Sequence, residues 1–353
     1  MILLQHVVTI AGLDKEIPCE ESQTILDACL RAGVWLPHAC THGTCGTCKS
    51  QIIEGEIDYG SASPFSLMDF EREERMALLC CATPRSDVAI EADIEIDPGV
   101  VFHRVVDQDA TVEALQEVAI ETRKLFVRLD APLRFTPGQY LRLYHPRESG
   151  YRNYSIANQD NPTELIELHI RRSPGGVFTD GWIFDSMRGG ERIKISGPFG
   201  RFVLRPLRPE PILLIAGGTG LAPIKAIIAD ILTSMPGREF HLFQGGRTLD
   251  TLYDVELFQA LHESAIGFFY HPVLSEESVA GFGHGMVTDA VENSFASLSG
   301  YVAYVCGPPP MVDASYKTLM RKRLFPRDIY REDFFDESDK VRGSSVESPL
   351  LRR

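Results

Sequence analysis

The sequence predicts a multidomain chain with three folded parts: a small α+β domain, an antiparallel β-barrel and an α/β domain with a doubly wound sheet. Three cysteines lie within nine residues near the N-terminus, short β-type segments separated by turn residues fill the middle, and apolar strands alternate with helices in the last third. A chain of 353 residues is long enough for two or three domains. We expect domains at 1–98, 101–207 and 208–336, followed by a disordered tail over 337–353.

The first part is expected to contain strands and one short helix. HVVTIAGLDKEIPC alternates like two short strands with a turn at Gly12. ESQTILDACLRAG starts with Ser and Thr and ends at Gly33, which predicts a capped helix. Two further strands are expected in CKSQIIEGEID and DVAIEADIEID, and the turn-forming Asp97-Pro98-Gly99 marks a hinge.

The second and third parts differ in their periodicity. FVRLD, GQYLRLYH, YSIAN, LIELHIRR and RIKIS are short β-type segments, which predicts an antiparallel barrel covered by a helix in VFTDGWIFDSM. After the proline-rich RPLRPEP, the strand ILLIAGG and the helix LAPIKAIIADILTSM begin a strand–helix alternation. Apolar strands in such an alternation predict a parallel sheet with helices on both faces.

Charge is unevenly distributed along the chain. The formal net charge is −14, and residues 1–98 hold 17 Asp and Glu against 6 Lys and Arg, a net of −11. Such a surface makes nucleic acid an unexpected partner. The excess either keeps the protein soluble or guides the first domain to a basic patch on another protein.

No stretch of the sequence is expected to cross or enter a membrane. No apolar run approaches the ~18 residues that a span requires. The opening MILLQHVVTIAGL lacks the basic flank and cleavage site of a secretory signal. A cytoplasmic location follows as the expectation, and there clustered cysteines bind metal more often than they form disulfides.

The segment HACTHGTCGTCKS carries the chemistry of the first part. Cys40, Cys45 and Cys48 form C-x4-C-x2-C, which with a distant fourth cysteine is the plant-type [2Fe–2S] spacing. Gly43 and Gly46 permit the positive φ angles that wrapping a cluster requires. A zinc site or a redox-active C-x-x-C is the alternative, but zinc would normally show a second close ligand pair.

Two further segments carry residue types suited to nucleotide cofactors. In YRNYSIAN, Arg152 can neutralise a diphosphate and Tyr154 offers a ring face to a flat heterocycle. Gly175 and Gly176 precede a helix, where N–H groups can face phosphate. In ILLIAGGTGLAP, three glycines fall between a strand and a helix, so a dinucleotide can approach the backbone; these are Gly217, Gly218 and Gly220.

The cysteine segment resembles plant-type ferredoxins, whose domain is a β-grasp fold. There the fourth ligand lies four residues before a proline, ahead of the closing strand. The resemblance therefore selects Cys80, four residues before Pro84, over its neighbour Cys81. Cys19 and Cys29 are expected to be core or surface residues.

The order of the later motifs resembles the ferredoxin–NAD(P)+ reductase superfamily, whose barrel binds FAD. The resemblance implies that Arg152 contacts the pyrophosphate, Tyr154 flanks the isoalloxazine and Ser155 lies near flavin N5. Near the C-terminus, Phe334 is expected to cover the flavin, with Phe335 as the alternative. The remaining residues that the resemblance assigns to FAD are Asn153, His169, Ile170, Arg171, Gly175, Gly176, Val177 and Thr179.

The same resemblance joins GGTGLAP and CGPPPM into a nicotinamide site. Thr219 and Cys306 would flank the nicotinamide and, with Ser155, act catalytically. VLSEES places Glu276 and Glu277 where NADP-specific relatives carry basic or hydroxyl residues, so we expect NADH rather than NADPH. The implied NADH contacts are Gly217, Gly218, Thr219, Gly220, Cys306, Gly307, Pro308 and Met311.

The order of the three parts resembles the reductase components of bacterial multicomponent oxygenases, over residues 1 to about 336. GVWLPHACTHGTCGTCK and SASPFSLMDFEREERMALLCCATP look most like phenol hydroxylase and toluene monooxygenase reductases, which serve soluble diiron hydroxylases. This implies electron transfer from NADH through FAD and the [2Fe–2S] cluster to an oxygenase that docks on the acidic first domain. A Rieske dioxygenase or sugar-deoxygenation client, or a redox-sensing binding module, remains an alternative.

Overall fold

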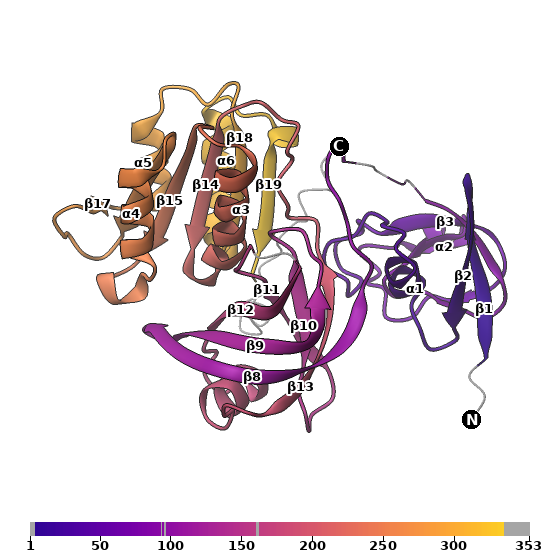
Figure 1. Ribbon diagram of the computed structural model, residues 1–353. Coiled ribbons are helices and arrows are strands. Elements are labelled where there is room, and N and C mark those ends of the chain that lie inside the picture. Colours follow the sequence, from indigo (N-terminus) through magenta and orange to yellow (C-terminus); the bar gives the residue numbers. More distant parts are fainter. Residues whose placement is uncertain (1–3, 93, 95–96, 160–161, 335–353) are drawn as a thin grey trace. The chain divides into compact units, whose positions relative to one another are not determined.

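The computed structural model describes residues 4–92, 94, 97–159 and 162–334. Residue contacts divide the chain into two units, which we describe separately (Figure 1). Of the described residues, unit 1 holds those up to Asp97 together with Val101–Val106, and unit 2 holds Pro98–Val100 and those from Asp107 to Phe334. The residues 337–353, expected to form a tail, lie outside the described residues. None of the described helices is both long and apolar enough to span a membrane.

Unit 1 is built on a five-stranded sheet in the order β2-β1-β7-β3-β5. The β1–β7 pair is parallel and the other pairs are antiparallel. Thr24 caps α1, because its side chain accepts a hydrogen bond from the Asp27 amide. The elements are β1 Gln5–Ile10, β2 Leu13–Glu20, α1 Ile25–Arg31, β3 Lys49–Glu54, β4 Ile57–Asp58, α2 Asp69–Glu73, β5 Met76–Leu78, β6 Thr83–Pro84 and β7 Val88–Glu91.

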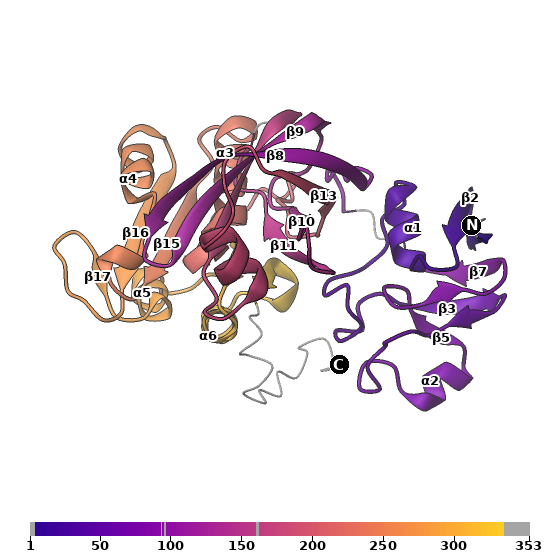
Figure 2. The ribbon, with the colours of Figure 1, turned by 90° about the horizontal axis from the view of Figure 1, so that it is seen from below.

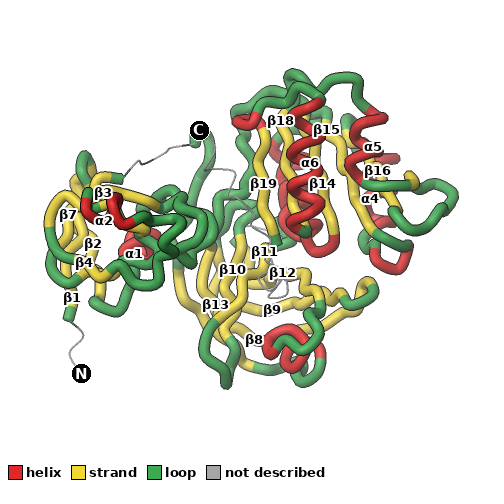
Figure 3. Tube along the Cα trace, turned by 180° about the vertical axis from the view of Figure 1, so that it is seen from behind, coloured by secondary structure: helices red, strands yellow, loops and turns green. Residues whose placement is uncertain are grey.

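The first half of unit 2 is a six-stranded antiparallel barrel in the order β11-β10-β13-β8-β9-β12. A bridge between Ile156, just after β11, and Leu168 in β12 joins the two edge strands. The regular elements of this half are strands joined by loops, with one helical segment, η1 (Figure 3). The elements are β8 Val106–Ala119, β9 Thr122–Leu133, β10 Tyr140–Tyr144, β11 Tyr151–Ser155, β12 Thr163–Arg171, η1 Val177–Phe184 and β13 Arg192–Phe199.

The second half of unit 2 is a parallel sheet in the order β17-β16-β15-β14-β18-β19. Helices cover both faces: α3 and α4 lie on one side, α5 and α6 on the other (Figure 2). The strands are β14 Ile212–Gly217, β15 Phe240–Gly246, β16 Phe268–Leu274, β17 Gly283–His284, β18 Val302–Gly307 and β19 Ile329–Asp333. The helices are η2 Gly218–Gly220, α3 Leu221–Ser234, η3 Leu249–Thr251, α4 Val255–Ser264, α5 Val287–Ser294, α6 Pro309–Arg321 and η4 Pro326–Asp328.

Buried strands explain why the sheet forms. All six residues of β14 and all six of β18 are buried, as expected for central parallel strands covered on both faces. Their carboxyl ends meet at one edge of the sheet, because Ala216 pairs with Cys306. This edge is where open α/β sheets bind their ligands. The predicted fold class, including the barrel and the doubly wound sheet, is confirmed.

Candidate functional site

The cysteine loop of unit 1 has the backbone that its glycines predicted. Gly43 and Gly46 have φ of 83° and 75°. A Cβ on Gly43 would lie 2.5 Å from the Cys81 sulfur, so no larger residue fits there. The loop is held in place by Ser63, whose amide donates to the Gly43 carbonyl, and by Ser66, whose hydroxyl donates to the Thr44 carbonyl.

The structure brings the four predicted ligand thiols together. The Cys40 thiol lies near Cys45 and Cys80, and the interaction with Cys45 contributes most to lowering its pKa. The Cys48 thiol interacts likewise with Cys80, which lowers the pKa of Cys48 and raises that of Cys80. Because the pKa values of Cys45 and Cys80 rise while those of their partners fall, the shifts indicate that the four thiols lie close together, as the ligands of one metal centre must.

The sulfurs are spaced too widely for one zinc ion. A tetrahedral zinc with bonds of about 2.3 Å holds its sulfurs roughly 3.8 Å apart. Within the described ranges, one group of three or more metal-binding side chains has ligand atoms within 4.8 Å of one another, and it contains no cysteine. The thiols instead interact in a row, Cys45 with Cys40, Cys40 with Cys80 and Cys80 with Cys48. A set spread in this way fits a two-iron cluster, in which each iron takes two thiolates.

The contacts also distinguish Cys80 from Cys81, the two adjacent cysteines that could supply the fourth ligand. Cys80 contacts two other thiols of the set, Cys40 and Cys48. The Cys81 sulfur lies 3.7 Å from the Cys80 sulfur and 4.0 Å from the Ser61 hydroxyl. Cys80 therefore has the better geometry for the fourth ligand. Cys19 and Cys29 are fully buried core residues away from this loop.

In the barrel, β11 carries the residues predicted to bind FAD. Arg152 and Asn153 are exposed, whereas Ser155 is buried at the end of the strand. The Arg152 guanidinium lies over the Phe178 ring at 4.5 Å, so η1 and β11 are side by side here. The Tyr154 hydroxyl is buried and has no hydrogen-bond partner among the described residues, which fits a hydroxyl that bonds to a bound cofactor.

The turn before η1 contains internal hydrogen bonds. The Gly175 amide donates to the Asp180 carboxylate at 2.7 Å, and the Gly176 amide donates to the Ser173 carbonyl at 2.9 Å. The Thr179 hydroxyl accepts from the Ser173 amide. The turn thus bonds both glycine amides internally, and their use for the phosphate of FAD stays a prediction.

The end of β12 and Phe334 carry the other residues predicted to contact FAD. The His169 side chain is fully buried and turned toward neighbouring side chains, whereas Ile170 is buried and Arg171 exposed. Phe334 packs against the α/β core, and its amide donates to the Gly307 carbonyl. The alternative, Phe335, lies outside the described residues.

The two predicted nicotinamide segments touch each other. A Cβ on Gly217 would lie 2.5 Å from the Met311 sulfur, and one on Gly220 would lie 2.3 Å from the Cys306 carbonyl oxygen. Only glycine permits this approach of η2 to the β18–α6 connection. Burial raises the pKa of the Cys306 thiol well above its ordinary value, so the thiol is protonated at neutral pH.

Glu332 is a residue of this region that the sequence analysis missed. It pairs with Cys306 in the β18–β19 register. Its Oε2 is buried without a hydrogen-bond partner among the described residues, and burial, followed by the charge of Asp333, raises its pKa to about 8. Nothing in the segment IYREDFF distinguishes this glutamate from an exposed one, because its burial depends on strand pairing.

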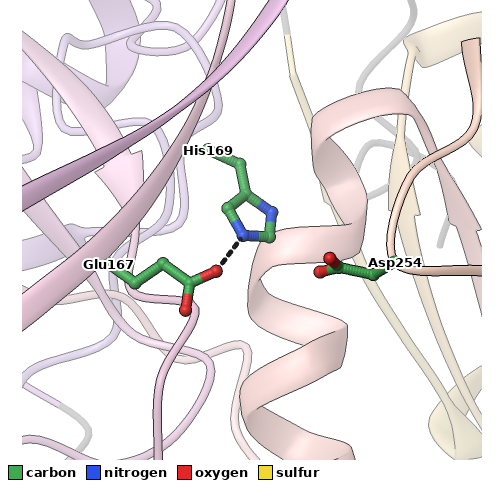
Figure 4. Close-up of side chains that lie close together, drawn as sticks. All are labelled: Glu167, His169 and Asp254. Carbon is green, nitrogen blue, oxygen red and sulfur yellow. Dashed lines mark hydrogen bonds and ion pairs between the residues drawn. The ribbon is translucent and has the colours of Figure 1, made fainter. Parts of the chain in front are cut away.

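A buried group of charged residues joins the barrel to the α/β half of unit 2. Glu167 and His169 extend from β12, and Asp254 precedes α4 (Figure 4). Two lysines lie among them: Lys124 is 2.6 Å from Asp254, and Lys225 is 2.7 Å from Glu167. We call these five residues the charged junction. Burial alone would raise the pKa of Glu167, but its bond with His169 and the charges of His169 and Lys225 lower it.

Comparisons with known proteins identify the three parts. Residues 8–85 match the family described as 2Fe-2S iron-sulfur cluster binding domain, residues 109–204 match Oxidoreductase FAD-binding domain, and residues 214–317 match Oxidoreductase NAD-binding domain. The phenol hydroxylase P5 protein of Acinetobacter pittii (strain PHEA-2) is 43% identical over 97% of this chain and 98% of its own length. The chain belongs to the family of oxygenase reductase components. This reductase is an oxidoreductase that uses NADH, FAD and a [2Fe–2S] cluster, as the motifs predicted.

Other relatives cover the reductase nearly end to end. The phenol 2-monooxygenase reductase component DmpP of Pseudomonas sp. (strain CF600) is 43% identical over 99% of this chain and all of its own length. Among solved structures, the Amycolatopsis cytochrome P450 reductase GcoB has a TM-score of 0.88 and 41% identity, covering 93% of this chain and 98% of that one. The ferredoxin reductase of carbazole 1,9a-dioxygenase has a TM-score of 0.78 and 26% identity, covering 95% and 100%.

Proposed function

We propose that this reductase supplies electrons to the hydroxylase of a multicomponent monooxygenase acting on aromatic compounds, with a diiron hydroxylase as its client. Two relatives named for phenol hydroxylation, each matched over nearly its whole length, support this client. The convergence of Cys40, Cys45, Cys48 and Cys80 carries the electron-transfer part, because four thiolates hold a [2Fe–2S] cluster, a one-electron centre. When bound, FAD accepts a hydride from NADH and gives up electrons singly to the cluster.

In this proposal the chain's own residues hold and orient the cofactors. Cys40, Cys45, Cys48 and Cys80 bind the cluster, and the Thr44 amide, 3.4 Å from the Cys40 sulfur, stabilises its thiolate. The residues proposed to contact FAD are Arg152, Asn153, Tyr154, Ser155, His169, Ile170, Arg171, Gly175, Gly176, Val177, Thr179 and Phe334. Since Gly175 and Gly176 use their amides internally, their proposed part is to shape the turn that leads into η1.

The nicotinamide is proposed to lie at the carboxyl ends of β14 and β18. The glycine-rich turn lets the backbone approach it, and the protonated Cys306 thiol and the buried Glu332 limit charge and water around the reacting ring. Ser155, Thr219 and Cys306 are the proposed catalytic residues. The residues proposed to contact NADH are Gly217, Gly218, Thr219, Gly220, Cys306, Gly307, Pro308 and Met311.

We propose that the client docks on unit 1 beside the cysteine loop. Phe65, Met68 and Phe70 are exposed there, with 81%, 46% and 56% of their surface accessible. They belong to the segment that hydrogen bonds to the loop through Ser66. Acidic residues surround them, and unit 1 is strongly negative, so the partner surface is expected to be basic with an apolar centre. The reductase is proposed to work in the cytoplasm, in domains 1–98, 101–207 and 208–336.

The client is tested by reconstitution. The purified reductase is mixed with NADH and, separately, a phenol hydroxylase-type diiron protein, a Rieske oxygenase and a cytochrome P450. Substrate hydroxylation coupled to NADH use by the diiron protein alone supports the proposal; coupling to another client contradicts the diiron assignment. Slow reduction of cytochrome c with tight, redox-dependent partner binding would instead favour a sensing module.

The docking surface has its own test. Phe65→Ala removes an exposed ring next to the cluster loop and should raise the KM for the hydroxylase about tenfold, since exposed aromatics at an interface centre contribute strongly. NADH-dependent ferricyanide reduction should not change. Ile266→Ala, an equally exposed apolar residue in unit 2, is the matched control. Equal KM values for Phe65→Ala and the control would contradict docking at this surface.

A further inference from the structure

A chain of hydrogen bonds runs from the barrel to the glycine-rich turn of the α/β half. The Glu167 carboxylate lies 2.8 Å from His169 Nε2, and His169 Nδ1 lies 3.0 Å from the Tyr253 hydroxyl. The Tyr253 hydroxyl, whose single proton faces both His169 Nδ1 and this turn, lies 3.3 Å from the Gly218 carbonyl. Glu167 and His169 are in β12 of the barrel, whereas Tyr253 and Gly218 belong to the α/β half. The chain is therefore a direct polar link between the two halves.

Two ammonium groups hold the barrel end of this link in place. Lys225 of α3 is 2.7 Å from Glu167 and 3.4 Å from Asp254, and Lys124 of β9 contacts the same two carboxylates at 3.3 Å and 2.6 Å. Two positive and two negative charges thus alternate in a closed group. The side chains of Lys124, Glu167 and Asp254 are about nine-tenths buried. Such a group resists displacement, because removing any one charge leaves another uncompensated.

The two lysines exclude a bound metal ion from the charged junction. Glu167, His169 and Asp254 have ligand atoms within 4.8 Å of one another, as a bound cation would need. The lysine ammoniums, however, already supply the compensating positive charge at hydrogen-bond distance. His169 Nδ1 is directed to Tyr253, so its lone pair or proton is engaged there.

Contacts of both its side chain and its backbone fix the position of Tyr253. Its ring meets the His169 imidazole edge-on at 5.2 Å, it is almost fully buried, and its carbonyl accepts from the Gln244 amide group at 3.0 Å. The next residue, Asp254, has φ of 59°, a conformation that Asp tolerates at modest cost. This left-handed residue begins α4 and belongs to the charged junction, which ties the position of Tyr253 to the two lysines.

We infer that Tyr253 is a positioning residue, which through His169 and Glu167 fixes the Gly218 turn relative to the barrel and so sets where the nicotinamide lies. The second half of this inference rests on the proposed nicotinamide site. The first half, that the hydroxyl restrains the turn, stands on the contacts alone. Tyr253 touches no reacting atom; it acts through the carbonyl of Gly218.

The test is Tyr253→Phe in the full-length, FAD-loaded protein, with two measurements. Hydrogen–deuterium exchange of the peptide covering residues 214–222, without NADH, should be about five- to tenfold faster, the effect of losing one net hydrogen bond. Anaerobic stopped-flow reduction by NADH should show a limiting rate at least about tenfold lower, with less than about twofold change in the NADH concentration at half-saturation.

The control is Tyr59→Phe in unit 1, which removes another tyrosine hydroxyl at 3.3 Å from a backbone carbonyl, that of Arg72. It should destabilise the protein yet leave the exchange of residues 214–222 and the limiting rate unchanged. If Tyr253→Phe does not fold, the same two measurements are made on His169→Gln. This variant is expected to show faster exchange of residues 214–222 and a lower limiting rate of reduction by NADH.

Three outcomes oppose the inference, and they can be told apart. Unchanged exchange of residues 214–222 in Tyr253→Phe overturns the restraint itself. Faster exchange with an unchanged limiting rate overturns the link from the turn to the nicotinamide. A wild-type protein that NADH does not reduce refutes the proposed function, and the exchange result then still decides whether Tyr253 restrains the turn.

Discussion

The cysteine loop of unit 1 and the charged junction of unit 2 each gather ionisable side chains, but by opposite means. In the loop, three of the four thiols come from nine consecutive residues, and two glycines in the left-handed region bring them together. In the junction, the ion pair between Lys124 and Asp254 joins residues 130 positions apart. The loop is a local structure, whereas the junction exists only after two folded halves have met.

This difference determines what each group can contribute. A local loop can bind a cofactor with little dependence on the rest of the fold. A group of buried charges, in contrast, costs desolvation energy and is stable only while all members are present. The junction is therefore suited to holding the two halves of unit 2 at one angle, and the loop to holding iron.

The largest effect on activity is expected when one cysteine ligand is removed from the loop. Cys45→Ser removes one thiolate of the proposed cluster, so reduction of cytochrome c or of the hydroxylase should fall more than about 100-fold, while NADH-dependent ferricyanide reduction at the flavin persists. Cys29→Ser is the control, since Cys29 is a buried cysteine outside the loop. Full turnover with the hydroxylase in Cys45→Ser would refute the relay through the cluster.

The next largest effect, on the free energy of unfolding, is expected when one charge is removed from the charged junction. Lys225→Met leaves Glu167 and Asp254 with one ammonium between them, and should lower the free energy of unfolding of unit 2 by about 3–5 kcal/mol. Lys317→Met breaks an exposed ion pair with Asp313 and should cost less than about 0.5 kcal/mol. Urea unfolding followed by flavin release measures both. Equal midpoints for the two variants would show that the junction does not stabilise unit 2.

These contrasts also explain which features the sequence could predict. The cysteine spacing, the positive φ of Gly43 and Gly46, and the alternation of strands and helices are local, and all three were confirmed. Glu167, Tyr253 and Glu332 carry no local signal, because their burial arises from contacts between distant strands. The turn at Gly175 adds a contact that its motif does not predict, because Asp180 five residues later accepts a hydrogen bond from the Gly175 amide.

A third prediction concerns the choice of nucleotide, which the sequence assigned from one short segment. Glu276 is exposed after β16, next to the Arg247 backbone, while the Glu277 carboxylate accepts a hydrogen bond from the Leu249 amide. Glu276→Gln therefore removes a repulsive charge without breaking the loop. The kcat/KM ratio of NADH to NADPH should fall about tenfold, a difference of ~1.4 kcal/mol.

The control for the nucleotide prediction is Glu292→Gln, an exposed glutamate on α5 paired with Arg321. Its NADH preference should equal that of the wild type. A wild-type kcat/KM that is higher with NADPH would contradict the assignment outright, and would point to Arg247 as the residue that holds the 2′-phosphate.

The smallest effect is expected at Glu332, whose burial depends on long-range pairing as the junction's does. Its folded pKa of about 8 lies above the ~4.3 of an unfolded glutamate, so between these values the unfolded chain has released a proton that the folded protein keeps. Stability from this group is therefore complete below about pH 4 and declines as pH rises toward 8. Glu332→Gln cannot ionise, so its unfolding free energy should exceed that of the wild type by on the order of 1 kcal/mol at pH 5, where the wild type has lost the first part of this stability. The two proteins should converge at pH 4, and a constant offset across this range in thermal unfolding would mean that Glu332 ionises normally.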